Sequence, residues 1–85
     1  MWYLYIVECS DGSLYTGITT DIGRRVHEHN NKIGAKSVRG KLPVKLVHSE
    51  QYPDNVTAAK RERQIKSMPR KKKLEIVNIG ISDNI

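Results

Sequence analysis

Three short segments have the pattern of apolar and polar residues that is typical of strands. Residues 2–9 are almost continuously apolar, aromatic or β-branched, as in a largely buried strand. Residues 10–12 contain an Asp-Gly pair, a strong hairpin signal, and lead into a second strand at residues 13–18. Residues 44–48 alternate with a period of two after a proline, which predicts a third strand at an edge of the sheet.

Apolar positions four or seven residues apart predict helices in the rest of the chain. The helices are expected at residues 20–30, 55–68 and 69–78, with a loop at residues 30–42. Thr20 or Asp21 caps the first helix, and Pro69 ends the second and begins the third. The order β-β-α-β-α-α predicts an α+β fold, in which about three helices flank a three-stranded antiparallel sheet.

The length of 85 residues is suited to one domain, which we place at residues 1–79, with residues 80–85 as a frayed tail. No apolar run approaches the ~20 residues of a membrane span, and the first residues do not resemble a signal peptide. The single cysteine, Cys9, excludes an internal disulfide and a cysteine-based zinc site. We therefore expect a cytoplasmic protein that does not bind a membrane.

Charge points to a polyanionic partner. Fifteen Lys and Arg residues against nine Asp and Glu residues give a formal net charge of +6, which suggests nucleic acid. The residues expected to contact phosphates, without reading sequence, are Lys32, Lys36, Arg39, Lys41 and Lys66. Residues 70–73 are also basic, and we expect them to form a solvated face. His27 and His48 are expected at the surface.

Two predicted helices carry charged or polar residues on the face that should be apolar. Arg25 and His29 lie on that face of the first helix, and Glu62 lies on that face of the second. Burying an unpaired charge is costly, so these groups should meet one another or line a cleft. They form either a structural Arg25–Glu62 ion pair or part of a functional site.

The length of the first hairpin loop decides whether its tyrosines share a face of the sheet. A two-residue loop would place Tyr5 and Tyr15 on opposite faces. A three-residue loop, with Gly12 in the left-handed region, would pair Val7 with Tyr15 and place both tyrosines and Gly17 on one face. The sequence permits either register.

These residues occur in the order of a known family. The triplets at residues 3–5 and 15–17 resemble the paired signature of GIY-YIG nucleases. Arg25, His29 and Glu62 follow where that family has its catalytic arginine, a histidine and its metal-binding glutamate. The likeness is closest to a small single-domain bacterial group that resembles the nuclease domain of structure-specific resolvases.

The resemblance implies an endonuclease that hydrolyses phosphodiester bonds in DNA with one divalent cation, Mg²⁺ or Mn²⁺. In this reading Glu62 holds the metal and Arg25 stabilises charge on the phosphate. Tyr15, or alternatively Tyr5, activates water, and His29 orients a tyrosine or receives its proton. Gly17 allows close backbone approach. We expect the five side chains to converge on one open concave surface, with Gly12 at positive φ.

The expected substrate is branched or flapped DNA, recognised by structure rather than sequence during repair or recombination. A partner protein that supplies specificity is also expected. Two other readings are a non-catalytic or partner-dependent nucleic-acid-binding module with the same fold, and a structural or regulatory interaction protein. A steep fall of binding with salt would separate the binding module from the interaction protein.

Overall fold

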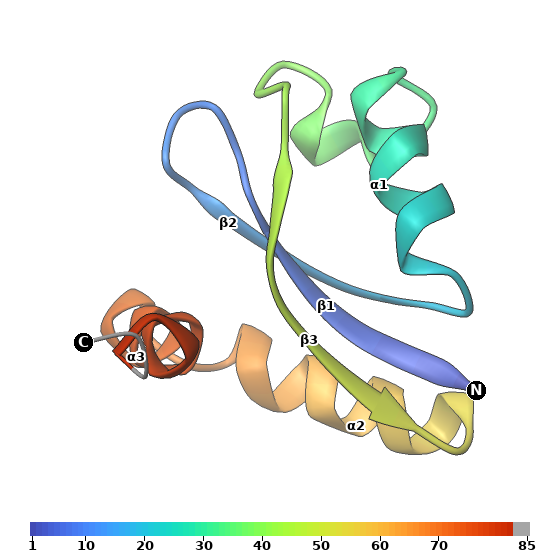
Figure 1. Cartoon of the computed structure of the whole chain (residues 1–85), viewed down its shortest axis with the longest axis vertical. Coiled ribbons are helices and arrows are strands. Elements are labelled where there is room, and N and C mark those ends of the chain that lie inside the picture. Colours follow the sequence, from blue (N-terminus) through green and yellow to red (C-terminus); the bar gives the residue numbers. More distant parts are fainter. Residues whose placement is uncertain (83–85) are drawn as a thin grey trace.

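An antiparallel sheet of three strands forms the centre of the molecule (Figure 1). The computed structural model describes residues 1–82. Strand β1 (Trp2–Glu8) lies between β2 (Leu14–Thr19) and β3 (Lys45–Tyr52), so β2 and β3 are edge strands. The predicted α+β fold, with a three-stranded antiparallel sheet and three helices, is confirmed.

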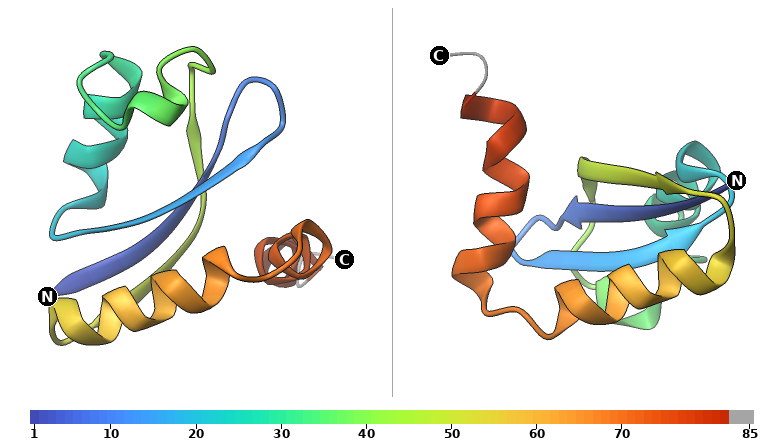
Figure 2. Two further views of the ribbon diagram at one scale, coloured as in Figure 1. Left: turned by 180° about the vertical axis from the view of Figure 1, so that it is seen from behind. Right: turned by 90° about the horizontal axis from the view of Figure 1, so that it is seen from below.

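Helices lie on both faces of this sheet (Figures 1 and 2). Helix α1 (Ile22–Asn30) and the short 3-10 helix η1 (Lys36–Val38) cover one face. Helices α2 (Asn55–Lys66) and α3 (Arg70–Ser82) pack on the other. Along the part of the chain that the structure describes, none of these helices has the length and apolar character needed to cross a membrane.

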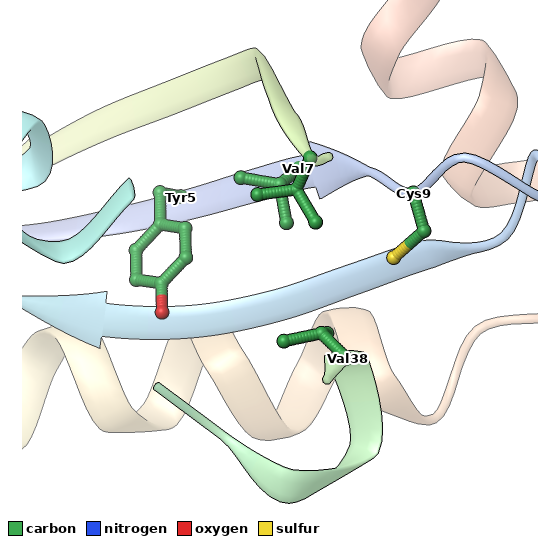
Figure 3. Packing of buried hydrophobic residues seen from close by; sticks show 5 residues of the cluster. Tyr5, Val7, Cys9 and Val38 are labelled. Carbon is green, nitrogen blue, oxygen red and sulfur yellow. The ribbon is translucent and has the colours of Figure 1, made fainter. Parts of the chain in front are cut away.

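Each face of the sheet has its own core because the side chains of β1 alternate between the two faces. The core on the α1 side contains Tyr5, Val7, Cys9, Val38 and Val44. Figure 3 shows the β1 side chains of this set with Val38 of η1 facing them. The core on the other side contains Leu4, Ile6, Ile65 and Val77. The packing role of Cys9 follows from its burial here.

Aspartate side chains begin α1 and α2. The Asp21 carboxylate accepts a hydrogen bond from the backbone N–H of Arg24 at 3.0 Å, and Asp54 accepts one from Thr57 at 2.8 Å. Such caps satisfy backbone amides that have no partner within the first turn. Asp21, rather than Thr20, is therefore the cap of the first helix.

The first hairpin has the odd-length loop. Gly12 has a φ of 85°, in the left-handed region. Val7 lies opposite Tyr15 in the register of β1 and β2. Tyr5 lies opposite Gly17. The two tyrosines therefore share the face that α1 covers, and the register that separates them is excluded.

Two elements run beyond their expected ends. β3 continues to Tyr52 rather than ending at His48, because its later residues also pair with β1. α3 extends through Ser82, into the tail expected at residues 80–85, of which 83–85 lie outside the described residues. The expected domain boundary stays a prediction.

Candidate active site

A buried tyrosine–histidine pair lies at the centre of the candidate site. Tyr5 on β1 is 1% exposed, and His29 on α1 is fully buried. The Tyr5 hydroxyl lies 3.0 Å from Nε2 of His29, and the backbone N–H of Ala35 donates to Nδ1 at 3.4 Å. A backbone N–H can only donate, so Nδ1 carries the lone pair. The neutral ring therefore has its hydrogen on Nε2 and donates it to the Tyr5 oxygen.

Burial keeps both members of this pair uncharged. Burial lowers the pKa of His29 below its ordinary value of 6.5, and the positive charge of Arg25 lowers it further. Burial raises the pKa of Tyr5 above its ordinary value of 10.0, although the nearby Arg25 guanidinium opposes part of this rise. At neutral pH the pair is a phenol that accepts a hydrogen bond from an imidazole.

Two glycines allow the close packing around the pair. A Cβ atom at Gly17 would lie 2.6 Å from the Tyr5 hydroxyl oxygen, and one at Gly34 would lie 2.2 Å from Nδ1 of His29. Both distances are too short for non-bonded atoms. The group that lies close to Gly17 is the Tyr5 ring, and the close backbone approach expected at Gly17 stays a prediction. Gly34 was not recognised from the sequence, where it is one of the glycines of a loop.

Asn30 holds the last turn of α1, and with it His29, in place. Its side-chain amide donates to the backbone oxygen of Val44 at 3.2 Å and accepts from the backbone N–H of Val44 at 2.7 Å. This two-way bond ties the end of α1 to the residue before β3.

Tyr15 lies beside the buried pair on the edge strand β2. Its ring centroid is 6.4 Å from that of Tyr5 and 5.4 Å from that of His29, to which it is edge-on. Tyr15 is only half-buried, whereas Tyr5 belongs to the core. The Nζ atom of Lys66, on α2, lies 5.9 Å from the Tyr15 ring centroid. Tyr15 is therefore the more accessible of the two tyrosines.

Helix α2 brings a carboxylate to the same edge from the opposite face of the sheet. Ala58 and Ile65 are fully buried on one face of this helix. Glu62 lies beside that face, and its Oε2 is 3.3 Å from Nζ of Lys66. The Glu62 side chain is 22% exposed, so it is not sealed from solvent. Its charge acts on Tyr5.

Arg25, on α1, interacts with Tyr5 and with Glu28. Its Nη1 donates to Oε1 of Glu28 at 3.1 Å, and its side chain is 31% exposed. Interaction with Tyr5 raises the pKa of Arg25 above its ordinary value. Over the described residues, no ion pair joins Arg25 to Glu62. The alternative of a structural Arg25–Glu62 ion pair is therefore wrong.

The residues brought near one another at the β2 edge are Tyr5, Tyr15, Arg25, His29 and Glu62. Their catalytic roles, and the open concave surface expected around them, stay predictions. A cavity of about 370 Å³ lies elsewhere, at the far end of β1. It is lined by Glu8, Cys9, Ser10, Pro43, Val44 and Lys45.

The basic residues expected to contact phosphates differ in their surroundings. Lys32, Lys36 and Arg39 are exposed and form no ion pair with any residue that the structure describes. Lys41 lies 3.8 Å from a carboxylate oxygen of Asp11, and Lys66 pairs with Glu62. Arg70 donates to the backbone oxygen of Gly12 at 2.9 Å, so it joins α3 to the hairpin loop in addition to facing solvent.

The GIY-YIG catalytic domain model matches residues 1–75. The chain belongs to the GIY-YIG family. This GIY-YIG protein is 54% identical over 82 residues to a UPF0213 protein of Haloquadratum walsbyi, a match that covers 96% of this chain and 92% of that protein. It is 47% identical over 78 residues to a UPF0213 protein of Staphylococcus saprophyticus, covering 92% and 95% of the two chains.

The same GIY-YIG fold is found in solved structures. The solution NMR structure of a UPF0213 protein from Bacillus halodurans matches with a TM-score of 0.61 and 42% identity, over 93% of this chain and 85% of that chain. A second NMR structure, of a protein from E. faecalis, has the same TM-score of 0.61 and 38% identity, over 91% and 82% of the chains. GIY-YIG proteins form a nuclease family, and the names of these relatives say nothing of a substrate.

Proposed function

We propose that this protein is an endonuclease that hydrolyses phosphodiester bonds in DNA with one divalent cation. The observation that carries this proposal is the meeting of Tyr15, Arg25 and Glu62 around one buried tyrosine–histidine pair. These side chains supply a candidate base, a cation for the phosphate and a carboxylate for a metal. They meet at β2, an edge strand that pairs only with β1 in the described sheet.

Tyr15 is the residue that we assign to activate the attacking water. It is half-buried, whereas Tyr5 is 1% exposed and already accepts a hydrogen bond from His29. A free tyrosine titrates near pH 10, so it needs neighbouring positive charge to act as a base at neutral pH. The Nζ atom of Lys66 lies 5.9 Å from the centroid of the Tyr15 ring, so a cation is close to this tyrosine. Tyr5 then positions Tyr15, and Tyr5 as the base is the second choice.

Arg25 is assigned to stabilise negative charge on the phosphate. A guanidinium is planar, stays charged and offers several N–H donors to phosphate oxygens. The Arg25 side chain remains partly exposed, and its bond to Glu28 uses one nitrogen, Nη1. His29 holds the Tyr5 hydroxyl rather than receiving its proton, because Nε2 already carries a hydrogen.

Glu62 is suited to hold Mg²⁺ or Mn²⁺. Its oxygen ligands are the type that hard cations prefer, and its partner Lys66 is 51% exposed and can move aside. Among the described residues, no three His, Cys, Asp or Glu side chains gather into a metal cluster. A single carboxylate, several waters and a substrate phosphate would together supply the oxygen ligands of such a cation. When bound, the cation offsets charge on the leaving oxygen.

The proposed substrate is branched or flapped DNA, cut during repair or recombination. Lys32, Lys36 and Arg39 are exposed cations that would contact phosphates without reading bases. A partner protein would supply further specificity. The free thiol of Cys9 is consistent with a reducing cytoplasm.

The test is a cleavage assay with branched, flapped and plain duplex DNA, and with matching RNA, in Mg²⁺ or Mn²⁺. Wild-type protein should cut branched or flapped DNA, and Glu62→Gln should not. Glu75→Gln is the matched control because Glu75 is an exposed glutamate on α3. The proposal fails if the wild type cuts no substrate, or if Glu62→Gln cuts at the wild-type rate.

The Glu62–Lys66 ion pair favours a second candidate function. While this pair is closed, the carboxylate is engaged by a lysine. The protein would then be a nucleic-acid-binding module that does not cleave until a partner opens the pair. It would bind DNA with a steep dependence on salt and cleave nothing on its own.

A further inference from the structure

The turn after α1 has a backbone conformation that favours glycine but contains a lysine. The backbone N–H of Ile33 donates to the oxygen of Glu28 at 3.0 Å, and that of Lys32 donates to the oxygen of His29 at 3.1 Å. This pair of bonds defines a Schellman motif, whose left-handed residue is usually glycine. Lys32 has a φ of 65° and is the one non-glycine residue with positive φ in the described chain. Strain of this kind persists at functional sites.

Ile33 does not make the contact that this motif normally includes. The residue after the left-handed position is often apolar and packs on the last helical turn. Here that turn presents His27, which is exposed, and Glu28, which is half-buried and whose carboxylate is paired with Arg25. Ile33 is 65% exposed. A hydrogen-bonded turn therefore holds a branched apolar side chain in solvent.

The same turn forms one side of the candidate active site. Gly34 follows Ile33 and packs so closely on His29 that a Cβ atom would lie 2.2 Å from Nδ1. The next residue, Ala35, donates its backbone N–H to that nitrogen. Ile33 is thus held at the margin of the Tyr5–His29 pair.

The charges that neighbour Ile33 in the sequence indicate the kind of partner. Lys32, Lys36 and Arg39 are exposed and carry no ion pair to the described residues. An exposed apolar side chain with these cationic neighbours suits a polyanion that also exposes apolar surface. Nucleic acid with an unstacked base is such a polyanion. We infer that Ile33 packs against an unstacked base at a branch point while Lys32 contacts a phosphate. This inference rests on the proposed function and gives a physical reason for selecting branched or flapped DNA.

The test compares Ile33→Ser with Val56→Ser. Val56 is the matched control because it is also branched and is 62% exposed, but lies on α2. Binding is measured without metal, by fluorescence anisotropy, on a plain duplex and on a flapped duplex carrying 2-aminopurine at the branch. Ile33→Ser should weaken flap binding about 10-fold, change duplex binding less than about twofold, and lose the rise in 2-aminopurine fluorescence that the wild type causes. Val56→Ser should match the wild type.

Equal weakening on both DNAs, or on neither, would overturn the inference. So would Ile33-dependent binding to phosphatidylglycerol vesicles with no preference for the flap. Since no cleavage enters this measurement, its outcome is separate from that of the proposed function. An inactive wild type with the flap effect would contradict only the nuclease proposal, and an active enzyme without the effect would contradict only the role of Ile33.

Discussion

Two polar clusters contact the sheet, and both contain tyrosine, histidine, arginine and glutamate. The first, on the α2 side of β3, is centred on Glu50. Its carboxylate accepts hydrogen bonds from Arg61 at 2.9 and 3.1 Å, is 2.8 Å from Nε2 of His48, and accepts one from Tyr52. Burial acts to raise the pKa of Glu50, but the bonds from Arg61, Tyr52 and His48 outweigh it and lower the pKa to about 2. We call this the Glu50 cluster.

The second cluster, at the β2 edge, is the candidate active site. In this cluster Tyr5 and His29 are hydrogen-bonded to each other. Arg25 and Glu62 do not pair with each other, and each forms an ion pair with a residue of its own helix instead. The same residue types therefore form two clusters with different pairing of their charges. The Glu50 cluster joins its charges directly, whereas the candidate site keeps Arg25 and Glu62 in two separate ion pairs, with Glu28 and Lys66.

The largest expected effect concerns the two arginines. Arg25→Ala should slow DNA cleavage by about 10³-fold, because it removes charge stabilisation in the transition state. Arg61→Ala should instead lower the free energy of unfolding by about 2 kcal/mol, because it leaves Glu50 without its main partner. Single-turnover cleavage and urea unfolding measure the two effects. If both variants changed the same quantity, the distinction between the clusters would be lost.

Gly17→Ala should disturb the site through Tyr5. The added Cβ would lie 2.6 Å from the Tyr5 hydroxyl and must displace the ring, which we expect to slow cleavage by about 10- to 100-fold. Gly40→Ala is the control, since nothing lies within 4 Å of a Cβ there. Cleavage rates of the two variants are compared on one flapped substrate. Equal rates would show that the position of the Tyr5 hydroxyl does not matter.

Acid should affect the Glu50 cluster in a defined pH window. The folded-state pKa of Glu50 is about 2, below the ordinary value of 4.5, so its stabilisation is complete above pH 4.5 and is lost as pH falls toward 2. The free energy of unfolding should drop across that window in the wild type. In Glu50→Gln the drop should be smaller. Urea unfolding between pH 2 and pH 6 measures it, and an unchanged slope in the variant would contradict this role of Glu50.

The smallest effect belongs to His29. Its folded-state pKa lies below 6.5, so the unfolded chain binds a proton first and stability should decline as pH falls below about 6.5. This loss of stability occurs at a higher pH than the loss that involves Glu50. It should disappear in His29→Gln, whereas the loss of stability below pH 4.5 should persist. Thermal unfolding from pH 5 to pH 8 detects it. A step retained in His29→Gln would assign it to another group.

Much of the site could be predicted because its signals are local. The local sequence permits two hairpin registers, and the resemblance to the family favours the one with Gly12 at positive φ, which the structure has and which places Tyr5 and Tyr15 on one face. The spacing of Arg25 and His29 along one helix predicts their common face. Short-range periodicity carries the information on the helix face without any tertiary contact, whereas turn chemistry narrows the hairpin to two registers.

The Glu50 cluster could not be predicted from the sequence. His48 was expected at the surface, but it is half-buried and bonded to Glu50. The cluster depends on β3 continuing beyond His48 and on Arg61 reaching it from α2, and both are tertiary facts. Gly34 was missed for the same reason, because its contact with His29 is made only when the loop folds back.

The most direct test makes the same substitution at one glutamate of each cluster and compares the two variants. Glu62→Gln and Glu50→Gln are assayed side by side for cleavage of flapped DNA in Mn²⁺ and for thermal midpoint. Glu62→Gln should lose cleavage and melt like the wild type, because an ion pair with a half-exposed lysine adds little stability. Glu50→Gln should cleave and melt several degrees lower. A Glu62→Gln protein that cuts at the wild-type rate, or that loses cleavage only because it melts far lower, would contradict the account.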